Sequence, residues 1–520
     1  MYVIQESKLK KGLPKETQSI CPVCKKVIPA TIYEENGKVM YKKTCPEHGE
    51  FKDIYFGDVE TYLRYEKWAF DGVGVKNPQI NGTNCPLDCG LCALHYSHTS
   101  LANIDLTNRC NLKCPICFAN ANAAGYVYEP TFEQVVKMME TLRNEKPVPT
   151  PAVQFAGGEP TIYPYFLEVV KKAKELGFAQ IQVATNGVRI AHEPDFAQKM
   201  LDAGLHTVYL QFDGFKESTY VKTRGRPGFL KEKLQALEYL RHTKPKPLAT
   251  VLVPVIVKGV NDDEVGKLID FGLENLDVVR SVNFQPVSFA GRIPQDELIV
   301  GRYTQGDLIN DLIKQTNYFE KRDFFPIPVA ALFSELASQI FKQPYVAFTS
   351  HPHCGTATYV FKDYDRNKVI PITRFIDVEG LLEELRPKIL EAKFDNRSKI
   401  FTVPYLYRVF KKYYDENQAP SHFKIKEILD VFKEGTKDSL GKLHWDSLFI
   451  GAMHFQDEYN YDLERLKRCV IHYATPDGRV IPFCAYNSGP VYRTEVEKKF
   501  SMSLEEYRKR YGNAVGTEGA

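Results

Sequence analysis

The stretch LANIDLTNRCNLKCPIC, residues 101–117, runs from an apolar strand pattern directly into three closely spaced cysteines. Residues 101–106 have the composition of a β-strand, and Cys110, Cys114 and Cys117 follow with the spacing C-x3-C-x2-C. Ligands of α/β proteins bind at the carboxyl ends of parallel strands. The stretch therefore predicts three thiol ligands at one end of a parallel sheet.

The strand pattern returns at regular intervals along the chain. Further apolar runs occur at 152–156, 181–184, 207–212, 249–257 and 281–287, with helix-like runs between them. Parallel strands need helical crossovers, so this alternation predicts a parallel α/β sheet. Six strands fall short of the eight that close a full barrel. We expect an open, partial (β/α)6 barrel over 100–292, with an ordinary doubly wound sheet as the alternative.

Glycines and polar residues end the strands that follow the cysteines. The second strand runs into Gly157, Gly158 and Glu159, the third into Asn186, and the fourth into Asp213. Glycine lets a ligand approach the backbone closely, and Glu159 offers a carboxylate to an ammonium group. As isolated turns these residues would more often be structural. Their recurrence at successive strand ends predicts one shared pocket.

A second C-x3-C-x2-C motif, made by Cys85, Cys89 and Cys92, lies just before the first strand. It is not followed by its own strand, helix and Gly-Gly-Glu-Pro sequence (GGEP, residues 157–160 in the first case). A second equivalent site is therefore not expected. Short cysteine spacings in a reducing compartment indicate metals rather than disulfides. We interpret this set as ligands of an iron–sulfur cluster that is auxiliary to the site at Cys110, Cys114 and Cys117. A structural zinc knuckle is the alternative.

Two more cysteine sets complete the total of 12 cysteines. Cys21, Cys24, Cys45 and His48 form two knuckle-like pairs that suit one tetrahedral ion, zinc or rubredoxin-like iron, unless His48 is a free surface histidine. Cys469 and Cys484 flank a predicted hairpin, and we expect them to hold a second auxiliary cluster with Cys354. The alternative is that one of these three cysteines is an ordinary buried thiol, and that each of the other two is the fourth ligand of another metal site.

The predicted domains follow these motifs. Residues 1–80 form a metal-knuckle domain of rubredoxin or zinc-ribbon type with a linker, and residues 81–99 form the auxiliary-cluster clip. The barrel over 100–292 precedes a helix-rich substrate and auxiliary-cluster domain over 293–520. Thr131 with Gln134, and Ser503 with Glu506, have the spacing of capping boxes at helix starts.

Charge and hydropathy exclude several classes of protein. The net charge is +3, from 68 basic and 65 acidic residues, and no polybasic run offers a footprint for nucleic acid. The first residues lack the apolar region of a signal peptide. The apolar runs are far shorter than the roughly 20 residues of a membrane span. These features predict a cytoplasmic protein, and peripheral contact with a membrane stays open.

With these motifs in place, residues 100–292 resemble the radical S-adenosylmethionine superfamily. The resemblance implies that Cys110, Cys114 and Cys117 hold a 4Fe–4S cluster whose open iron binds S-adenosylmethionine. It implies that Gly157, Gly158 and Glu159 contact the methionine amino group. Asn186 and Asp213 are candidates for the ribose, and Arg224 for the carboxylate.

The adenine contact departs from the superfamily pattern. The residue before the third cysteine is usually aromatic, but here it is Ile116, and Phe118 follows the cysteine instead. The resemblance also implies a low-potential electron donor such as ferredoxin, and a 5′-deoxyadenosyl radical that abstracts hydrogen from unactivated C–H bonds. The cofactor supplies this chemistry, while the protein orients the reactants.

Nearly the whole chain resembles the archaeal tetraether lipid synthase family, through CPVC…CPEHG, CPLDCGLC, CNLKCPICFANAN and the segment from Gly451 to Cys484. That resemblance implies an archaeal glycerophospholipid substrate, with C–C bond formation between the terminal methyl carbons of two lipid chains. It implies three 4Fe–4S clusters and one mononuclear iron or zinc. Such a substrate needs a long apolar tunnel, which the aromatic and aliphatic residues of 320–520 could line, although such residues more often form core.

Three alternatives remain open at this point. The first is a radical methylase that uses a methylene-pterin as its one-carbon donor. The second is a peptide-modifying maturase, although no precursor-recognition module is evident near the N-terminus. The third is a metal-knuckle protein that binds nucleic acid without catalysis, against which the near-neutral charge and the GGEP pocket argue.

Overall fold

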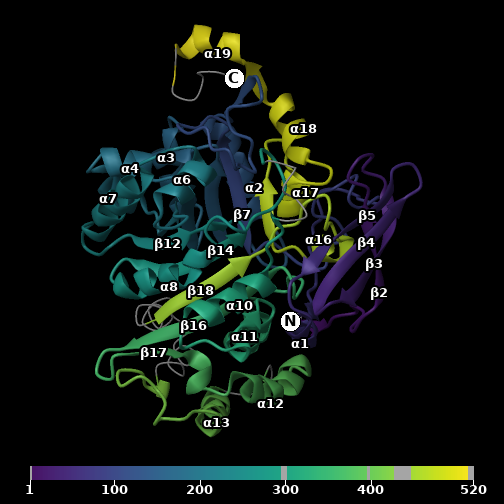
Figure 1. Ribbon diagram of the computed structural model, residues 1–520, viewed down its shortest axis with the longest axis vertical. Helices are drawn as coiled ribbons and strands as arrows, with labels where there is room; N and C mark the ends of the chain where they lie inside the picture. Colours follow the sequence, from purple (N-terminus) through teal and green to yellow (C-terminus); the bar gives the residue numbers. More distant parts are fainter. Residues whose placement is uncertain (1–2, 294–300, 395–398, 427–446, 513, 515–520) are drawn as a thin grey trace.

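The N-terminal part of the chain forms a small antiparallel sheet. The computed structural model describes residues 3–293, 301–394, 399–426, 447–512 and 514. In this first domain, strands β2 to β5 pair in sequence order, and helix α1 (Val59–Tyr65) follows them. The strands are β2 (Lys15–Ile20), β3 (Val27–Glu35), β4 (Lys38–Cys45) and β5 (Gly49–Phe56). This domain lies at one side of the molecule (Figure 1).

A large sheet forms the centre of the protein. Six neighbouring strands match the six predicted ones and are all parallel to one another. They are β7 (Leu101–Thr107), β9 (Ala152–Gly157), β10 (Gln180–Thr185), β11 (Thr207–Gln211), β12 (Ala249–Val253) and β14 (Val279–Pro286). No pairing closes the two ends of the sheet among the described strands, so the partial barrel is confirmed.

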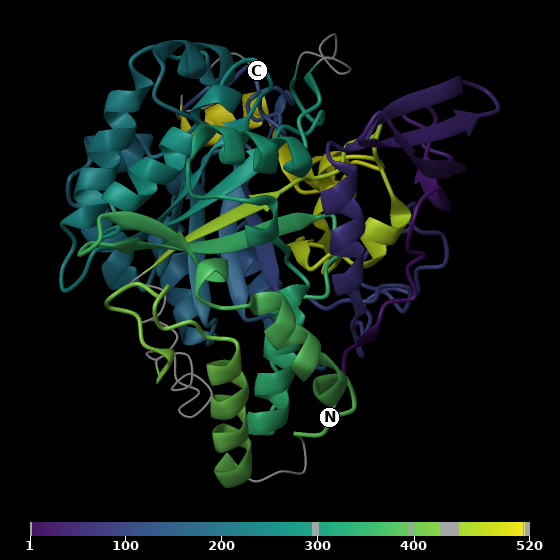
Figure 2. The ribbon, with the colours of Figure 1, turned by 60° about the horizontal axis from the view of Figure 1, so that its bottom comes forward.

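Crossover helices cover the outer face of this sheet, on the side away from the N-terminal domain (Figures 1 and 2). Their apolar faces pack on the strands; in α3, for example, Phe166, Val169, Val170 and Ala173 are buried. The predicted capping box of Thr131 and Gln134 opens the first helix. The helices are α2 (Phe132–Arg143), α3 (Phe166–Glu175), α4 (Val188–His192), α5 (Phe196–Ala203), α6 (Glu217–Arg224), α7 (Phe229–Arg241) and α8 (Val265–Glu274).

The C-terminal region extends the sheet at both edges. Strand β18 (Ser447–Met453) lies parallel to β14, and β16 (Gly355–Asp363) continues antiparallel to β18. At the other edge β19 (Ile471–Ala474) lies parallel to β7, and β20 (Val480–Pro482) closes the predicted hairpin. The prediction of a helix-rich region missed these strands, because local patterns do not show which distant strands pair. Short strands complete the chain: β1 (Gln5–Glu6), β6 (Phe70–Asp71), β8 (Tyr126–Tyr128), β13 (Val255–Ile256), β15 (Phe325–Pro326), β17 (Lys368–Pro371) and β21 (Ser501–Ser503).

The apolar segment that could have lined a lipid tunnel forms a second core, the more common role of such residues. Helix α11 (Val329–Phe341) buries Leu332, Leu336 and Ile340 against neighbouring helices. Among the described helices, none combines the length and apolarity required to cross a membrane. The helices of this region are α10 (Gln305–Gln315), α11, α12 (Val378–Leu390), α13 (Lys399–Lys412), α16 (Leu463–Lys467), α17 (Phe483–Asn487), α18 (Tyr492–Lys499) and α19 (Leu504–Tyr511).

Candidate active site and metal centres

A cavity of about 270 Å³ lies at the carboxyl ends of the central strands. It brings together residues from all six central strands with residues of the C-terminal region. Eight of the residues predicted from the sequence line it: Cys110, Cys114, Cys117, Phe118, Gly157, Gly158, Asn186 and Arg224. Cys484 lines the same cavity from the C-terminal side. The cavity is therefore the candidate active site.

Two polar side chains fix the loop that carries the three cysteines. The Asn122 amide donates to the carbonyls of Cys110 (2.7 Å) and Leu112 (3.1 Å), and its oxygen accepts from the Cys110 N–H. Arg292 donates to the Cys114 carbonyl at 2.8 Å, and its backbone pairs with Cys117. These contacts order a loop without regular structure, so the thiols are held in place before any metal binds.

Gly157 and Gly158 also allow two parts of the backbone to approach each other closely. Gly157 has φ +129°, and a Cβ on it would overlap the Thr107 carbonyl oxygen. A Cβ on Gly158 would overlap the carbonyl oxygen of Arg109. The main close approach is therefore between the GGEP turn and the backbone leading into the cysteines. Both glycines still border the cavity with their backbone atoms.

Glu159 and Asp213 are not among the residues that line the cavity, and their contacts with a ligand stay a prediction. Glu159 is 1% exposed and accepts hydrogen bonds from Thr161, Thr185 and the Asn186 N–H. Asp213 is fully buried and forms a two-point ion pair with Arg224, at 2.5 and 2.8 Å. Both carboxylates hold the strand ends in position because internal donors occupy their oxygens.

The remaining predicted residues, Asn186, Arg224 and Phe118, line the cavity close to the cysteine loop. Asn186 donates to the Asn111 oxygen at 2.6 Å, and its amide nitrogen is 3.9 Å from the Cys110 sulfur. Arg224 donates to the Ile116 carbonyl at 3.3 Å, so its guanidinium borders the cysteine loop. Phe118 is 38% exposed at the cavity rim. Sequence reasoning missed Lys233, whose pKa burial lowers to about 7 and whose amine donates to the Asn186 carbonyl.

The three thiols have the chemistry of iron–sulfur ligands. Burial raises the pKa of Cys110 and of Cys114, so the thiolates need a cation to form. Among the described residues, the set in the N-terminal domain is the one whose metal-ligating atoms all lie within 4.8 Å of one another. Cys110, Cys114 and Cys117 line the active-site cavity together, and three thiolates can hold three irons of a four-iron cluster. The site fits a 4Fe–4S cluster.

Polar side chains inside the barrel form a wall that the sequence analysis overlooked. Inward positions of four strands, β7, β9, β11 and β14, present an amide or a phenol to the cavity. Gln154 donates to the Asn103 oxygen at 2.7 Å and accepts from Gln182 at 2.8 Å. The signal was available as a polar residue at alternate positions of apolar strands. The residues on this wall are Asn103, Gln154, Tyr209, Gln211, Asn283 and Gln285.

Cys21, Cys24, Cys45 and His48 converge at the end of the N-terminal sheet, as predicted. The Cys24 and Cys45 sulfurs are 3.8 Å apart, and His48 Nδ1 is 3.5 Å from Cys45 and 3.7 Å from Cys21. A tetrahedral zinc ion with ordinary Zn–S and Zn–N bonds has ligand separations of about 3.6–3.8 Å. The hydrogen bond from His48 is the main influence that lowers the pKa of Cys45. This ribbon site fits one tetrahedral ion.

Replacing Cys45 with serine is expected to remove this ion, because a hard hydroxyl replaces one of three soft thiolates. Elemental analysis of purified chain should show one zinc or iron fewer per molecule. Glu47→Gln is the matched control, since Glu47 is an exposed neighbour that pairs with Lys26. An unchanged metal content in Cys45→Ser would contradict the assignment.

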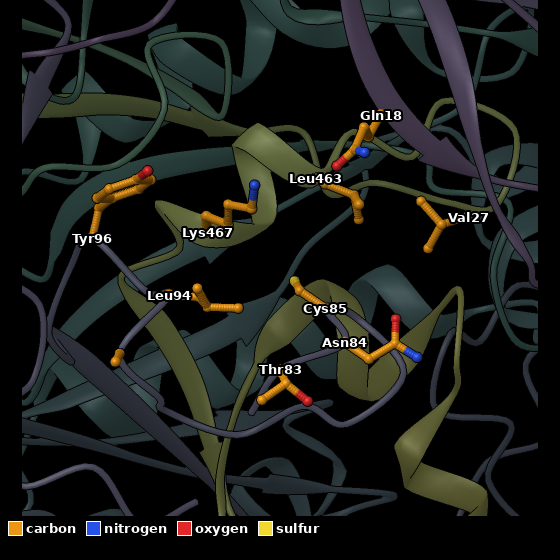
Figure 3. A pocket seen from close by; sticks show the side chains of 10 residues that line it. Gln18, Val27, Thr83, Asn84, Cys85, Leu94, Tyr96, Leu463 and Lys467 are labelled. Carbon is orange, nitrogen blue, oxygen red and sulfur yellow. The ribbon is translucent and has the colours of Figure 1, made fainter. Parts of the chain in front are cut away.

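The second cysteine set (Cys85, Cys89 and Cys92) surrounds a small internal space together with His95. Burial raises the pKa of Cys85 to about 11. An open cleft of about 350 Å³ lies beside this set, between the N-terminal sheet and α16. Figure 3 shows the Cys85 sulfur in this cleft, with Lys467 and Leu94 nearby. A metal centre at the second set would lie close to solvent.

The third cysteine set (Cys354, Cys469 and Cys484) gathers where β16, β18 and the hairpin meet. Cys484 is the second residue of helix α17 and Cys469 precedes β19, so both lie just outside the paired strands. Burial, together with the nearby Cys484, raises the pKa of Cys469. The Cys469 thiol donates to the Ile471 carbonyl at 3.0 Å, a contact that metal binding would replace. The set fits a metal centre that faces the active-site cavity.

Comparison with known proteins agrees with this geometry. The model of the radical SAM superfamily matches residues 104–272, and that of the HMPTM N-terminal zinc ribbon domain matches residues 13–57. A GTP 3′,8-cyclase of Limosilactobacillus fermentum is 26% identical, over 44% of this chain and 64% of its own length. A solved structure of methylornithine synthase is 16% identical, with a TM-score of 0.31, over 43% of this chain and 64% of that one. Fold, thiol loop and family match together define a radical SAM enzyme.

A 7,8-dihydro-6-hydroxymethylpterin dimethyltransferase of Methanocaldococcus jannaschii is 49% identical over 507 residues. The match covers 96% of this chain and 98% of that enzyme. This chain belongs to the family of that pterin dimethyltransferase. The predicted tetraether lipid synthase, with its glycerophospholipid substrate, is therefore wrong. The motifs that carried the resemblance, above all the cysteine sets, are equally compatible with the pterin enzyme.

Proposed function

We propose that this chain is a radical SAM methyltransferase that acts on 7,8-dihydro-6-hydroxymethylpterin or a closely related reduced pterin. The likeness to the Methanocaldococcus jannaschii enzyme over nearly its full length carries the proposal. It coincides with the methylase that the sequence analysis kept as its first alternative. The methylene-pterin one-carbon donor of that alternative belongs to the proposal as well.

The wall of amides supports a heterocyclic substrate over a lipid chain. A pterin ring carries several N–H donors and ring or carbonyl acceptors along its edge. Asn103, Gln154, Gln211, Asn283 and Gln285 offer both donors and acceptors to the cavity. Part of their hydrogen-bonding capacity is used within the protein, as between Gln154 and Asn103, and the rest is available to a polar ring but not to an alkyl chain. Polar groups placed on an otherwise apolar wall orient a ligand.

Different residues of the cavity would bind the cluster and S-adenosylmethionine. Cys110, Cys114 and Cys117 would hold the cluster, while Asn186, Arg224 and the Gly157–Gly158 backbone border the space for S-adenosylmethionine. With S-adenosylmethionine bound, the cluster supplies a carbon radical that removes hydrogen from an unactivated C–H bond. Phe118, which packs near Phe483 at 5.6 Å, shields this space from solvent.

The second and third cysteine sets would each hold an auxiliary cluster, which gives three clusters in all with the first. The second set lies beside the open cleft of Figure 3, where a low-potential donor such as ferredoxin can approach it. The third set faces the active-site cavity through Cys484. Iron and sulfide analysis of chains that lack one set at a time tests this inventory.

Replacing Gln285 with leucine is expected to raise the KM for the pterin by about 2–10-fold, because one hydrogen bond to the ring is lost. The rate of S-adenosylmethionine cleavage without pterin should not change, since Gln285 lines the cavity from β14 and is not part of the cysteine loop. Gln198→Leu on α5 is the matched control. Equal KM values for the two variants would argue against pterin binding at this wall.

The proposal is tested by incubating anaerobically purified protein with S-adenosylmethionine, dithionite, 7,8-dihydro-6-hydroxymethylpterin and a methylene-pterin donor. Mass spectrometry should find a pterin that has gained one and then two methyl groups. Omission of either pterin should stop the reaction. If the substrate mass stays unchanged while S-adenosylmethionine is cleaved, the proposed substrate is wrong.

A further inference from the structure

Arg465 is an arginine side chain buried beside the third cysteine set. It lies on α16, is 2% exposed, and its Nε donates to the Cys354 sulfur at 3.4 Å. One terminal nitrogen donates to the His454 carbonyl at 2.5 Å. The guanidinium also stands over the ring of Tyr55, 5.7 Å from its centre. All of these contacts are to neutral groups if Cys354 is a thiol.

Four other buried arginines of this protein have carboxylate partners. Arg224 pairs with Asp213, Arg302 with Asp457, Arg468 with Asp71 and Arg493 with Asp105. Arg465 forms no ion pair with a carboxylate among the described residues. A buried charge without a counter-charge costs several kcal/mol, so a missing anion is the simplest explanation.

The nearest carboxylates are already engaged elsewhere. Asp462 caps the start of α16 and accepts from Thr17 and from Tyr55 at 2.7 Å. Asp457 is paired with Arg302. The groups that remain around the guanidinium are the thiols of Cys354 and Cys484. The Gln456 backbone N–H also donates to the Cys484 sulfur, at 3.4 Å.

We propose that Arg465 is the counter-ion of an anionic metal–thiolate centre at the third cysteine set, and that it raises the reduction potential of that centre. This inference rests on the auxiliary cluster of the proposed function. Reduction adds one electron to the centre, and an adjacent cation stabilises the more negative, reduced state more strongly. Hydrogen bonds to ligand sulfurs act in the same direction.

A raised reduction potential at the third cysteine set would affect the reaction, because this set lies beside the active-site cavity. Cys484 lines the active-site cavity together with Phe483 and Asn487. A centre that is easier to reduce is better suited to accept an electron from a substrate radical than to pass one onward. Arg465 thus biases the third set toward electron acceptance beside the pterin, while the second set lies near solvent.

The test is an EPR-monitored redox titration of full-length chain in which Cys110, Cys114 and Cys117 are alanine, so that only auxiliary centres give signals. The signal that disappears in the further variant Cys354→Ala belongs to the third set. Arg465→Gln should lower the ratio of reduced to oxidised centre at a fixed potential about tenfold or more, equivalent to about 59 mV. Arg465→Lys, which keeps the charge, should show a smaller shift of the same sign.

Arg374→Gln is the control, because Arg374 pairs with Asp323 and contacts no cysteine. An unchanged potential in Arg465→Gln, with the signal retained, would overturn the proposal. Loss of the signal in both Arg465 variants while circular dichroism shows a folded chain would also overturn it, because lysine keeps the charge. A parent chain without any such signal would instead refute the auxiliary cluster itself, and the methylation assay remains independent of all these outcomes.

Discussion

Changing Cys114 to alanine is expected to reduce the formation of 5′-deoxyadenosine by more than about 100-fold. Removal of groups that only support a metal ligand already costs 10–100-fold, and loss of the ligand itself costs more. Cys114 lines the cavity beside Arg224 and belongs to the loop anchored by Asn122 and Arg292. Chromatography of the products from anaerobic reactions with dithionite measures the change.

Cys24→Ala provides a matched control for this experiment. Cys24 is also a predicted metal ligand, but it belongs to the ribbon site in the N-terminal domain and does not border the cavity. It should keep the cleavage of S-adenosylmethionine within a fewfold of the parent chain. If Cys114→Ala cleaves S-adenosylmethionine as well as Cys24→Ala does, the radical chemistry does not depend on the proposed loop.

The replacement of Arg302 by methionine is expected to destabilise the protein by about 3–5 kcal/mol, the cost of breaking a buried ion pair from one side. Arg302 is 1% exposed and donates to Asp457 at 3.0 Å and to Asp53 at 2.5 Å. It thereby joins the N-terminal sheet to the loop that holds Gln456. Anaerobic denaturant unfolding should show the loss as an earlier midpoint.

The ion pair between Arg302 and Asp457 also predicts that the free energy of unfolding depends on pH. Burial raises the pKa of Asp457, but the charge of Arg302 and hydrogen bonds from Phe289 and Tyr459 outweigh it and hold the pKa below its ordinary value. A lowered folded-state pKa stabilises the protein above the unfolded-state value of about 3.9, and this contribution is lost as pH falls below it. Arg302→Met should therefore lose part of its acid sensitivity.

Arg322→Met is the control for both measurements. Arg322 forms an exposed pair with Glu320, with side chains 67% and 57% exposed, and such pairs contribute about 0–1 kcal/mol. Its midpoint should stay close to that of the parent chain at every pH. Equal midpoints for the two arginine variants would contradict the role of the buried pair.

The central strands and the cysteine loop could be predicted from the sequence because their signals are local. Apolar runs, a capping box at Thr131 and a C-x3-C-x2-C spacing each lie within a few residues. Strands β18 and β19, which extend the central sheet on its two sides, could not be placed, since their partners β14 and β7 are more than a hundred residues away. Parallel pairing over that distance leaves no short-range pattern.

The roles of individual site residues were only partly predictable. Glu159 and Asp213 stand at the right strand ends, but hydrogen bonds within the protein turn both carboxylates away from the cavity. Those bonds depend on Thr185 and Arg224, whose positions relative to the carboxylates no spacing rule shows. The amide of Gln285 was overlooked although its strand alternates polar and apolar residues. Cysteine motifs dominated the interpretation, and they do not distinguish a lipid from a pterin.

The most direct test of the central claim is the fate of hydrogen from the pterin substrate. We expect 7,8-dihydro-6-hydroxymethylpterin that carries deuterium on its ring methylene and hydroxymethyl carbons to transfer deuterium into 5′-deoxyadenosine, with methylated pterin formed in the same reaction. Mass spectrometry of both products measures the transfer. Unlabelled 5′-deoxyadenosine together with unmethylated pterin would contradict the account.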